Sequence, residues 1–133
     1  SVPIWLGGSS KVAIRRAALL GDGWLPQGPP KMGLSNAISF IRSEREAAGL
    51  PAAFDLGMNF GSVFLGPADF DLELFARGPA VQGGAEEVAE RINKFAAKGI
   101  NQIQLRFLGK DAQQVCDQIE QFGAEVGPLL SCD

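Results

Sequence analysis

The chain has 133 residues, of which 46% are hydrophobic and 20% are charged, so it suits one folded domain with its own core and excludes a disordered chain. Its 12 Lys and Arg against 15 Asp and Glu give a net charge of -3, which argues against nucleic-acid binding, since that needs a basic surface. Pro3, Gly7 and Gly8 interrupt the first apolar stretch, so we expect no signal peptide, no membrane span and a cytoplasmic location.

Residue types narrow the chemistry further. The sequence contains no histidine and no tyrosine, which excludes His-based catalytic triads, His-ligated zinc and a tyrosine acid. Cys116 and Cys132 are too few for a disulfide framework or a metal cluster. Any reaction must therefore use carboxylates, Lys or Arg, hydroxyls, backbone N–H groups or a bound cofactor.

The first predicted unit is a strand followed by a helix. The short apolar run at residues 2–6 stops at Gly7 and Gly8, as a buried strand would. A helix is predicted over residues 11–20, with capping serines before it and a glycine after it. We expect Val12, Leu19 and the alanine pairs of this helix to form its buried face, and Arg15 and Arg16 to reach solvent.

The second predicted unit is shorter. A turn at Asp22-Gly23 leads into a brief strand at residues 24–25, and a Pro-rich loop follows over residues 27–33. A helix is predicted from Ser35 to about Ala48, with Arg45 on its buried side because its aliphatic stem can cover apolar surface.

The remaining two units complete an alternating pattern. A strand is predicted over residues 54–60 or slightly beyond, and a long connection over 61–83 follows, in which residues 69–75 fit a short helix. A helix is then predicted over residues 85–98. The last unit joins a strand at 100–107 to a helix that begins at Asp111, whose apolar stripe is Val115, Ile119, Phe122 and Val126. Strands that alternate with helices predict a parallel sheet with right-handed crossovers.

The loop between the first strand and the first helix is the leading candidate site. Ligands of parallel α/β folds bind at the carboxyl ends of the strands, and small residues at a helix N-terminus let a phosphate approach free N–H groups. The candidate residues are Gly7, Gly8, Ser9 and Ser10. A tight turn with a capping serine explains the same pattern, so both interpretations stay open.

Three weaker candidates lie elsewhere. Asn59, near the end of the third strand, could bond a heterocycle or fill space, and Arg106, near the end of the fourth, could meet an anion or form a salt bridge at the rim. The acids Asp69 and Asp71 are typical of a solvated helix start rather than of an acid/base pair. The catalytic residues stay unknown.

Several motifs together resemble the luciferase-like monooxygenase family. They are Pro3-Ile4-Trp5-Leu6-Gly7-Gly8-Ser9, the run from Arg15 to Pro26 with Gly21-Asp22-Gly23-Trp24, the stretch from Gly83 to Val88, and Gln104-Leu105-Arg106-Phe107. The resemblance extends to members that use FMN or a deazaflavin coenzyme, and the Gly-Asp-Gly-Trp pattern favours the deazaflavin.

The resemblance implies a fold and a role. Family members fold as eight-stranded (βα) barrels, and the matching motifs belong to strands five to eight, so residues 1–133 are expected to form a single half-barrel domain of α/β class with four parallel βα units. In the family, the loop after strand five helps to hold the flavin phosphate, which would carry over to Gly7, Gly8, Ser9 and Ser10. The resemblance further implies an oxidoreductase or monooxygenase that transfers hydride through its flavin.

A half-barrel leaves two strand edges and an apolar concave face unpartnered. We therefore expect a homodimer through the sheet edges and the concave face, or a missing half supplied by another chain. Two alternatives stay open: an inactive half-barrel dimer that only binds a phosphate-bearing ligand, and an open flavodoxin-type sheet outside the family.

Overall fold

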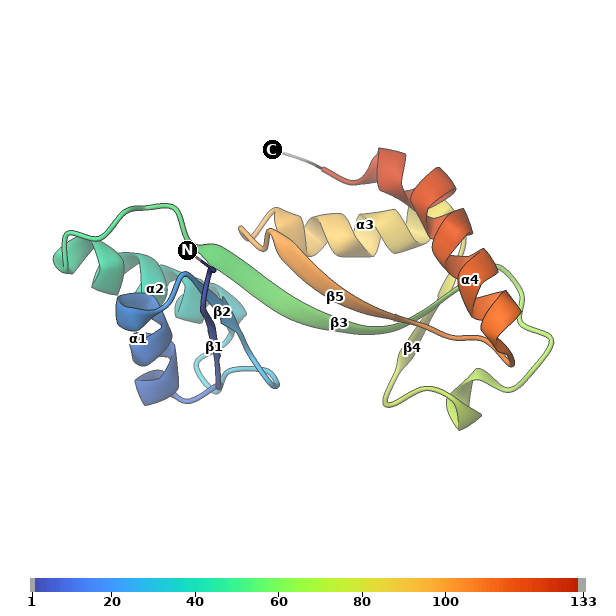
Figure 1. The fold of residues 1–133 in the computed structure, drawn as a ribbon, viewed down its shortest axis with the longest axis horizontal. Coiled ribbons are helices and arrows are strands. Elements are labelled where there is room, and N and C mark those ends of the chain that lie inside the picture. Colours follow the sequence, from blue (N-terminus) through green and yellow to red (C-terminus); the bar gives the residue numbers. More distant parts are fainter. Residues whose placement is uncertain (1, 132–133) are drawn as a thin grey trace. The chain divides into compact units, whose positions relative to one another are not determined.

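The computed structural model describes residues 2–131, which fall into two compact units (Figure 1). The first unit runs to Asn59 and includes Lys98–Ile103, and the second comprises Phe60–Ala97 and the residues from Gln104 onward. Strands β3 (Asp55–Leu65) and β5 (Gln102–Phe107) pair with each other, and each contributes residues to both units. That the whole chain forms a single domain stays a prediction.

The first unit holds two strand–helix pairs. It contains β1 (Trp5–Gly7), α1 (Lys11–Leu20), β2 (Gly23–Leu25), α2 (Leu34–Ala47) and the start of β3. The strands are parallel and in the order β1-β2-β3, with Trp5 opposite Gly23 and Gly23 opposite Asp55. These elements confirm the first two predicted units, although β1 begins three residues later than expected.

The second unit differs more from the prediction. It contains the rest of β3, the 3-10 turn Leu72–Leu74, β4 (Ala80–Gly83), α3 (Ala85–Ala96), most of β5 and α4 (Ala112–Gln121). After α4 the backbone continues as a π turn at Phe122–Val126 and a 3-10 turn at Gly127–Leu129. Strand β4, which pairs in parallel with Ser62–Leu65, was expected to be an irregular connection.

The prediction ended the third strand too early because of Gly61. A glycine within an apolar run commonly marks the end of a strand, and Gly61 does adopt a left-handed φ of 103°. The strand nevertheless continues to Leu65, because Val63, Phe64 and Leu65 are all buried and gain β4 as a neighbour. The glycine therefore marks an irregularity inside β3 rather than its end.

Small side chains let α1 pack closely in the first unit. Ile14, Ala17 and Ala18 are fully buried, and Trp24 from β2 is fully buried as well. The expectation for Val12 was wrong, because its side chain is 71% exposed. The alanines that were predicted to share this face do belong to it, since Ala17 and Ala18 are fully buried, whereas Val12 points into solvent.

Arg45 is buried within the first unit, as predicted, but its role is polar as well as apolar. Only 8% of the residue is exposed, and its guanidinium donates to four backbone carbonyls. The closest are those of Ala18 and Pro51, both at 2.8 Å, and the charge also lies 4.5 Å from the centre of the Phe54 ring. Because Ala18 belongs to the last turn of α1, the cation also faces the negative end of that helix.

Gln118 has a comparable role in the second unit. Its side chain is 5% exposed, its Oε1 accepts from the Leu65 N–H at 2.6 Å and its Nε2 donates to the Leu65 carbonyl at 3.0 Å. The amide thus satisfies both backbone groups at the end of β3. Ile119, predicted to belong to the buried stripe of this helix, is instead 49% exposed.

Replacing Arg45 by Met is expected to lower the free energy of unfolding by about 2–3 kcal/mol, because the buried carbonyls lose their donor. Trp5 and Trp24, the two tryptophans of the chain, both lie in the first unit, so their fluorescence in a urea titration reports its unfolding. Arg42→Met, an exposed position on the same helix, should change stability by less than about 0.5 kcal/mol. Equal effects of the two substitutions would contradict the structural role of Arg45.

Replacing Gln118 by Leu is expected to lower the stability of the second unit by about 2 kcal/mol, because Leu65 is left with an unpaired N–H and C=O. Far-UV circular dichroism during urea unfolding measures the loss, and Gln113→Leu, at an exposed position on the same helix, is the control. In Gln118→Glu, burial should raise the pKa of the introduced carboxyl, which is protonated and able to donate at low pH. That variant should therefore lose stability as the pH rises from about 5 to 8.

Candidate functional site

In the loop from Gly7 to Ser10, the backbone at Gly8 has a conformation that strongly favours glycine. Gly8 adopts a φ of 104°, and a Cβ there would lie 2.6 Å from the Cβ of Ala13. Its carbonyl accepts a hydrogen bond of 2.8 Å from the indole Nε1 of buried Trp24. The core of the first unit therefore fixes the direction of this loop.

The two serines that follow have different partners. The Ser9 hydroxyl donates to the carbonyl of Gly28 at 2.7 Å, which ties the loop to the Pro-rich segment after β2. The Ser10 hydroxyl accepts from the Ala13 N–H at 3.2 Å and caps α1, as predicted. The N–H groups of Lys11 and Val12 belong to the first helical turn, where a helix offers no internal acceptor.

The Gly-Asp-Gly-Trp pattern is explained by packing. Asp22 accepts from the Ile4 N–H at 2.8 Å through its carboxylate, and its own N–H donates to the Ile4 carbonyl at 2.8 Å. A Cβ on Gly23 would lie 2.7 Å from the Trp5 ring, so that ring rests on the backbone of β2. Trp24 fills the core. These contacts account for the pattern without any preference for one flavin.

The other predicted site residues lie on strands. Asn59, in the first unit, is exposed on β3, and Arg106, in the second, is exposed on β5. Arg106 forms no ion pair with any residue between 2 and 131, so the rim salt bridge considered for it is not present. Its side chain alternates along β5 with the half-buried Leu105 and Phe107, which places it on the polar face of that strand.

The helix N-termini of the molecule differ in charge. The first turn of α1 contains no acid and its cap is a hydroxyl. In contrast, α3 begins with Glu86 and Glu87, and α4 is capped by the Asp111 carboxylate, which accepts from the Gln114 N–H at 2.8 Å. A carboxylate at a helix N-terminus occupies the position that an anion would take. Among these three helices, α1 is the one whose start best suits a phosphate.

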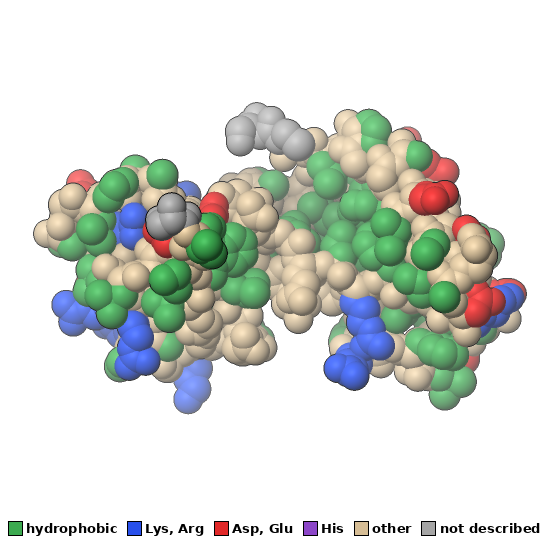
Figure 2. Space-filling view, in the orientation of Figure 1, with side chains coloured by type: hydrophobic (Ala, Val, Ile, Leu, Met, Phe, Trp, Pro, Cys, Tyr) green, Lys and Arg blue, Asp and Glu red, His purple; other side chains and the backbone are tan. Residues whose placement is uncertain are grey.

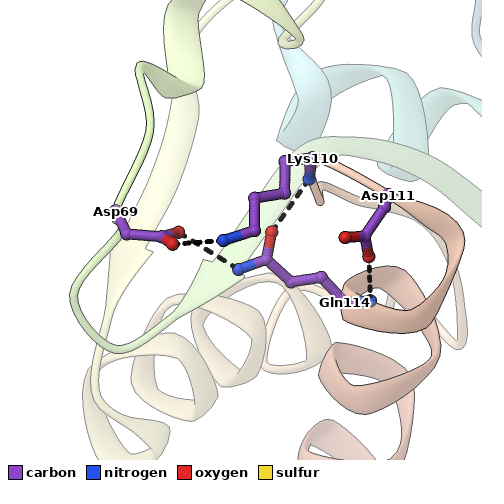
Figure 3. A network of polar contacts seen from close by, with 4 residues as sticks. All are labelled: Asp69, Lys110, Asp111 and Gln114. Carbon is purple, nitrogen blue, oxygen red and sulfur yellow. Dashed lines mark hydrogen bonds and ion pairs between the residues drawn. The ribbon is translucent and has the colours of Figure 1, made fainter.

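A polar network that sequence reasoning missed lies at the carboxyl ends of β3 and β5 (Figure 3). The Asp69 carboxylate accepts from Lys110, and Gln114 donates to the same carboxylate at 3.4 Å. The hydrogen bond from Lys110 lowers the pKa of Asp69, and the same contact raises the pKa of Lys110. Asp71 is engaged separately, because it accepts from the Glu73 N–H at 3.0 Å and caps the short 3-10 turn. The two acids therefore do not form a pair.

Within residues 2–131 no group of three or more Cys, Asp or Glu side chains is arranged to hold a metal ion. In the same range, no helix has the length and apolar character that crossing a bilayer requires.

Solved structures share this fold. An F420-dependent secondary alcohol dehydrogenase, in complex with an F420-acetone adduct, is similar with a TM-score of 0.71 and 16% identity over 99% of this chain and 50% of that one. The coenzyme F420-dependent tetrahydromethanopterin reductase from Methanopyrus kandleri gives a TM-score of 0.70 and 14% identity over 98% and 51%. A riboflavin lyase, with modified FMN and substrate riboflavin, gives 0.67 and 17% over 94% and 42%.

These similarities confirm the predicted fold class. The chain aligns over nearly its full length but spans only about half of each of these relatives, as half of a (βα)8 barrel would. They therefore favour the half-barrel over an open flavodoxin-type sheet. No curated protein matches the sequence.

The sequence also matches a family of proteins directly. The family model described as luciferase-like monooxygenase aligns with residues 1–73, a range that includes the loop after β1 and the Gly-Asp-Gly-Trp pattern. That range is more than half of the 133 residues. The chain belongs to the luciferase-like monooxygenase family.

Proposed function

We propose that this chain binds the phosphate of a flavin, either FMN or a deazaflavin coenzyme, at the loop from Gly7 to Ser10, as part of a flavin-dependent oxidoreductase. The observation that carries the proposal is the first turn of α1: a glycine turn held by Trp24, hydroxyls on Ser9 and Ser10, and no acid nearby in the helix. The similar structures include one with modified FMN and two of F420-dependent enzymes, which supports the same ligand class.

The residues present fit a phosphate group. Gly8 has no side chain over the helix start, and its φ excludes other residues, so the backbone there stays open to a close approach. The N–H groups of Lys11 and Val12 and the hydroxyl hydrogen of Ser10 are the donors that would hold the phosphate oxygens. Ser9 would contribute less, since its hydroxyl already donates to Gly28.

A bound flavin would supply hydride transfer, and the residues of this chain would bind and orient it. Asn59 is proposed to hydrogen-bond the ring, because amide side chains can both donate to and accept from a heterocycle. Arg106 is proposed to meet an anionic group of the ligand, since its guanidinium has no ion-pair partner within residues 2–131. No described residue is assigned a catalytic step.

The second part of the proposal concerns the missing half of the barrel. A homodimer, in which the sheet edges and concave faces of two copies meet, would join two sets of four strand–helix units and enclose the flavin ring. An inactive dimer that binds a phosphate-bearing ligand without turnover fits the same loop. The absence of histidine and tyrosine, two common acid/base groups, favours this second candidate.

Binding of FMN is expected to be at least about tenfold tighter than binding of riboflavin, because riboflavin lacks the phosphate. Replacing Ser10 by Asp should lower FMN affinity by about tenfold relative to the unmodified chain. Asp still caps α1 but places a negative charge where the phosphate would lie. Riboflavin affinity should stay unchanged. Flavin fluorescence titrations of the intact chain measure both ligands, and the deazaflavin coenzyme can be titrated in the same way.

Ser35→Asp is the matched control, because it places the same charge in the first turn of α2. This variant should have the same ratio of FMN affinity to riboflavin affinity as the unmodified chain. The proposal fails if neither flavin binds, if FMN and riboflavin bind equally well, or if Ser10→Asp leaves the ratio unaltered. Reduction of the bound flavin by NAD(P)H or a reduced deazaflavin would separate the oxidoreductase from the inactive binder.

A further inference from the structure

Within residues 2–131, strands β1, β4 and β5 each have a single neighbour in the sheet, and β1 and β5 are the first and last strands of the strand–helix units. Strand β1 pairs with β2, and β5 pairs with β3, so each has one open edge within residues 2–131. In a (βα) barrel, the helix after a strand packs toward the next strand because the crossover is right-handed. A partner that completes the barrel would therefore place its first strand beside β5 and its first helix beside α4.

The helices that flank these edges expose large apolar side chains. In α1, Val12 is 71% and Leu20 is 76% exposed, and their spacing of eight residues puts them on one face. Ile4, which directly precedes β1, is 60% exposed, and Ile119 of α4 is 49% exposed. The sequence pattern predicted burial for both Val12 and Ile119.

The same two helices carry opposite charges. Helix α1 contains Lys11, Arg15 and Arg16 and no acid, whereas residues 111–126 contain Asp111, Asp117, Glu120 and Glu125 and no cation. In Figure 2, blue side chains gather over the part of the molecule that carries α1, and red side chains over the part that carries α4.

Arg16 and Glu120 are the clearest members of these two sets. Arg15 is already paired with Glu44 at 2.8 Å, and Asp117 accepts from Gln113 at 2.8 Å. Arg16 and Glu120 form no ion pair with residues 2–131, and both are exposed. Arg16 lies between the exposed Val12 and Leu20 on one face of α1, and Glu120 lies next to the exposed Ile119 of α4, so each helix presents apolar surface beside a charge.

We infer that the outer face of α1, formed by Val12, Arg16 and Leu20, packs against the face of α4 around Ile119 and Glu120 in a second copy of this chain. A second copy is the occupant that these surfaces fit, because one chain carries both a cationic helix face and an acidic helix face, each with exposed apolar surface. In a twofold pair, each of the two faces would be used twice, once by each copy.

The inference deepens the proposed dimer and rests on it, but it does not depend on flavin binding. Sedimentation equilibrium between about 1 and 100 μM should give twice the 14.1 kDa of one chain at the upper end. Arg16→Glu and Glu120→Arg should each weaken association by about tenfold, with a larger effect at low salt. The double variant should recover to within about threefold of the parent, because it restores opposite charges.

Arg91→Glu, an exposed charge reversal on α3, is the matched control and should leave association unchanged. The inference is wrong if the chain stays monomeric at every concentration, if it forms open chains of copies, or if the double variant shows only the summed loss. Circular dichroism verifies that each variant is folded. Ser10→Asp should leave the dimer intact. Arg16→Glu and Glu120→Arg should leave unchanged the ratio of FMN affinity to riboflavin affinity. A failure of the dimer proposal can therefore be told apart from a failure of the flavin proposal.

Discussion

The indole N–H of Trp24 donates to the carbonyl of Gly8 from inside the core, and this bond ties the packing of the first unit to the geometry of its exposed loop. The carbonyl of Gly8 is held inward, so the backbone turns through a left-handed φ before α1 begins. A buried donor that lost its acceptor would destabilise the core as well as the loop. The proposed phosphate site thus depends on a residue that itself would never touch the ligand.

The residues that identify the family serve largely to pack the sheet. Gly23 leaves room for the ring of Trp5, and Asp22 bonds to both backbone groups of Ile4 and, through its carbonyl, to the N–H of Asp55. Arg45 then binds the carbonyls at the end of α1 and in the loop before β3. A family pattern of this kind is informative about fold, whereas the chemistry depends on the few loop residues that packing leaves free.

Half of a barrel has a specific energetic problem. Its edge strands keep unpaired backbone groups, and the helices beside them lack the neighbours that would cover their outer sides. In the proposed dimer, Val12, Leu20 and Ile119, which are exposed in the single chain, would be covered by the second copy. The separation of charge between α1 and α4 gives such a closure a preferred orientation, because like-charged helices would repel.

The sequence alone determined the alternation of strands and helices, the capping of α1 by Ser10 and the burial of Arg45, because caps, glycine stops and helical spacing are local signals. It also determined the half-barrel and its family, through motifs that span most of the chain. It could not place β4 or extend β3 past Gly61, since both depend on pairing between segments that are distant in the sequence.

Only the tertiary structure decided which side chains find partners. The bonds of Gln118 to Leu65 and of Lys110 to Asp69 join residues more than 40 positions apart, and no periodicity reports them. The same holds for Val12 and Ile119, whose apolar character predicted burial. The hydrophobic pattern of a helix indicates which side chains are stabilised by burial. Whether those side chains are buried depends on the neighbouring surfaces, which the tertiary structure provides.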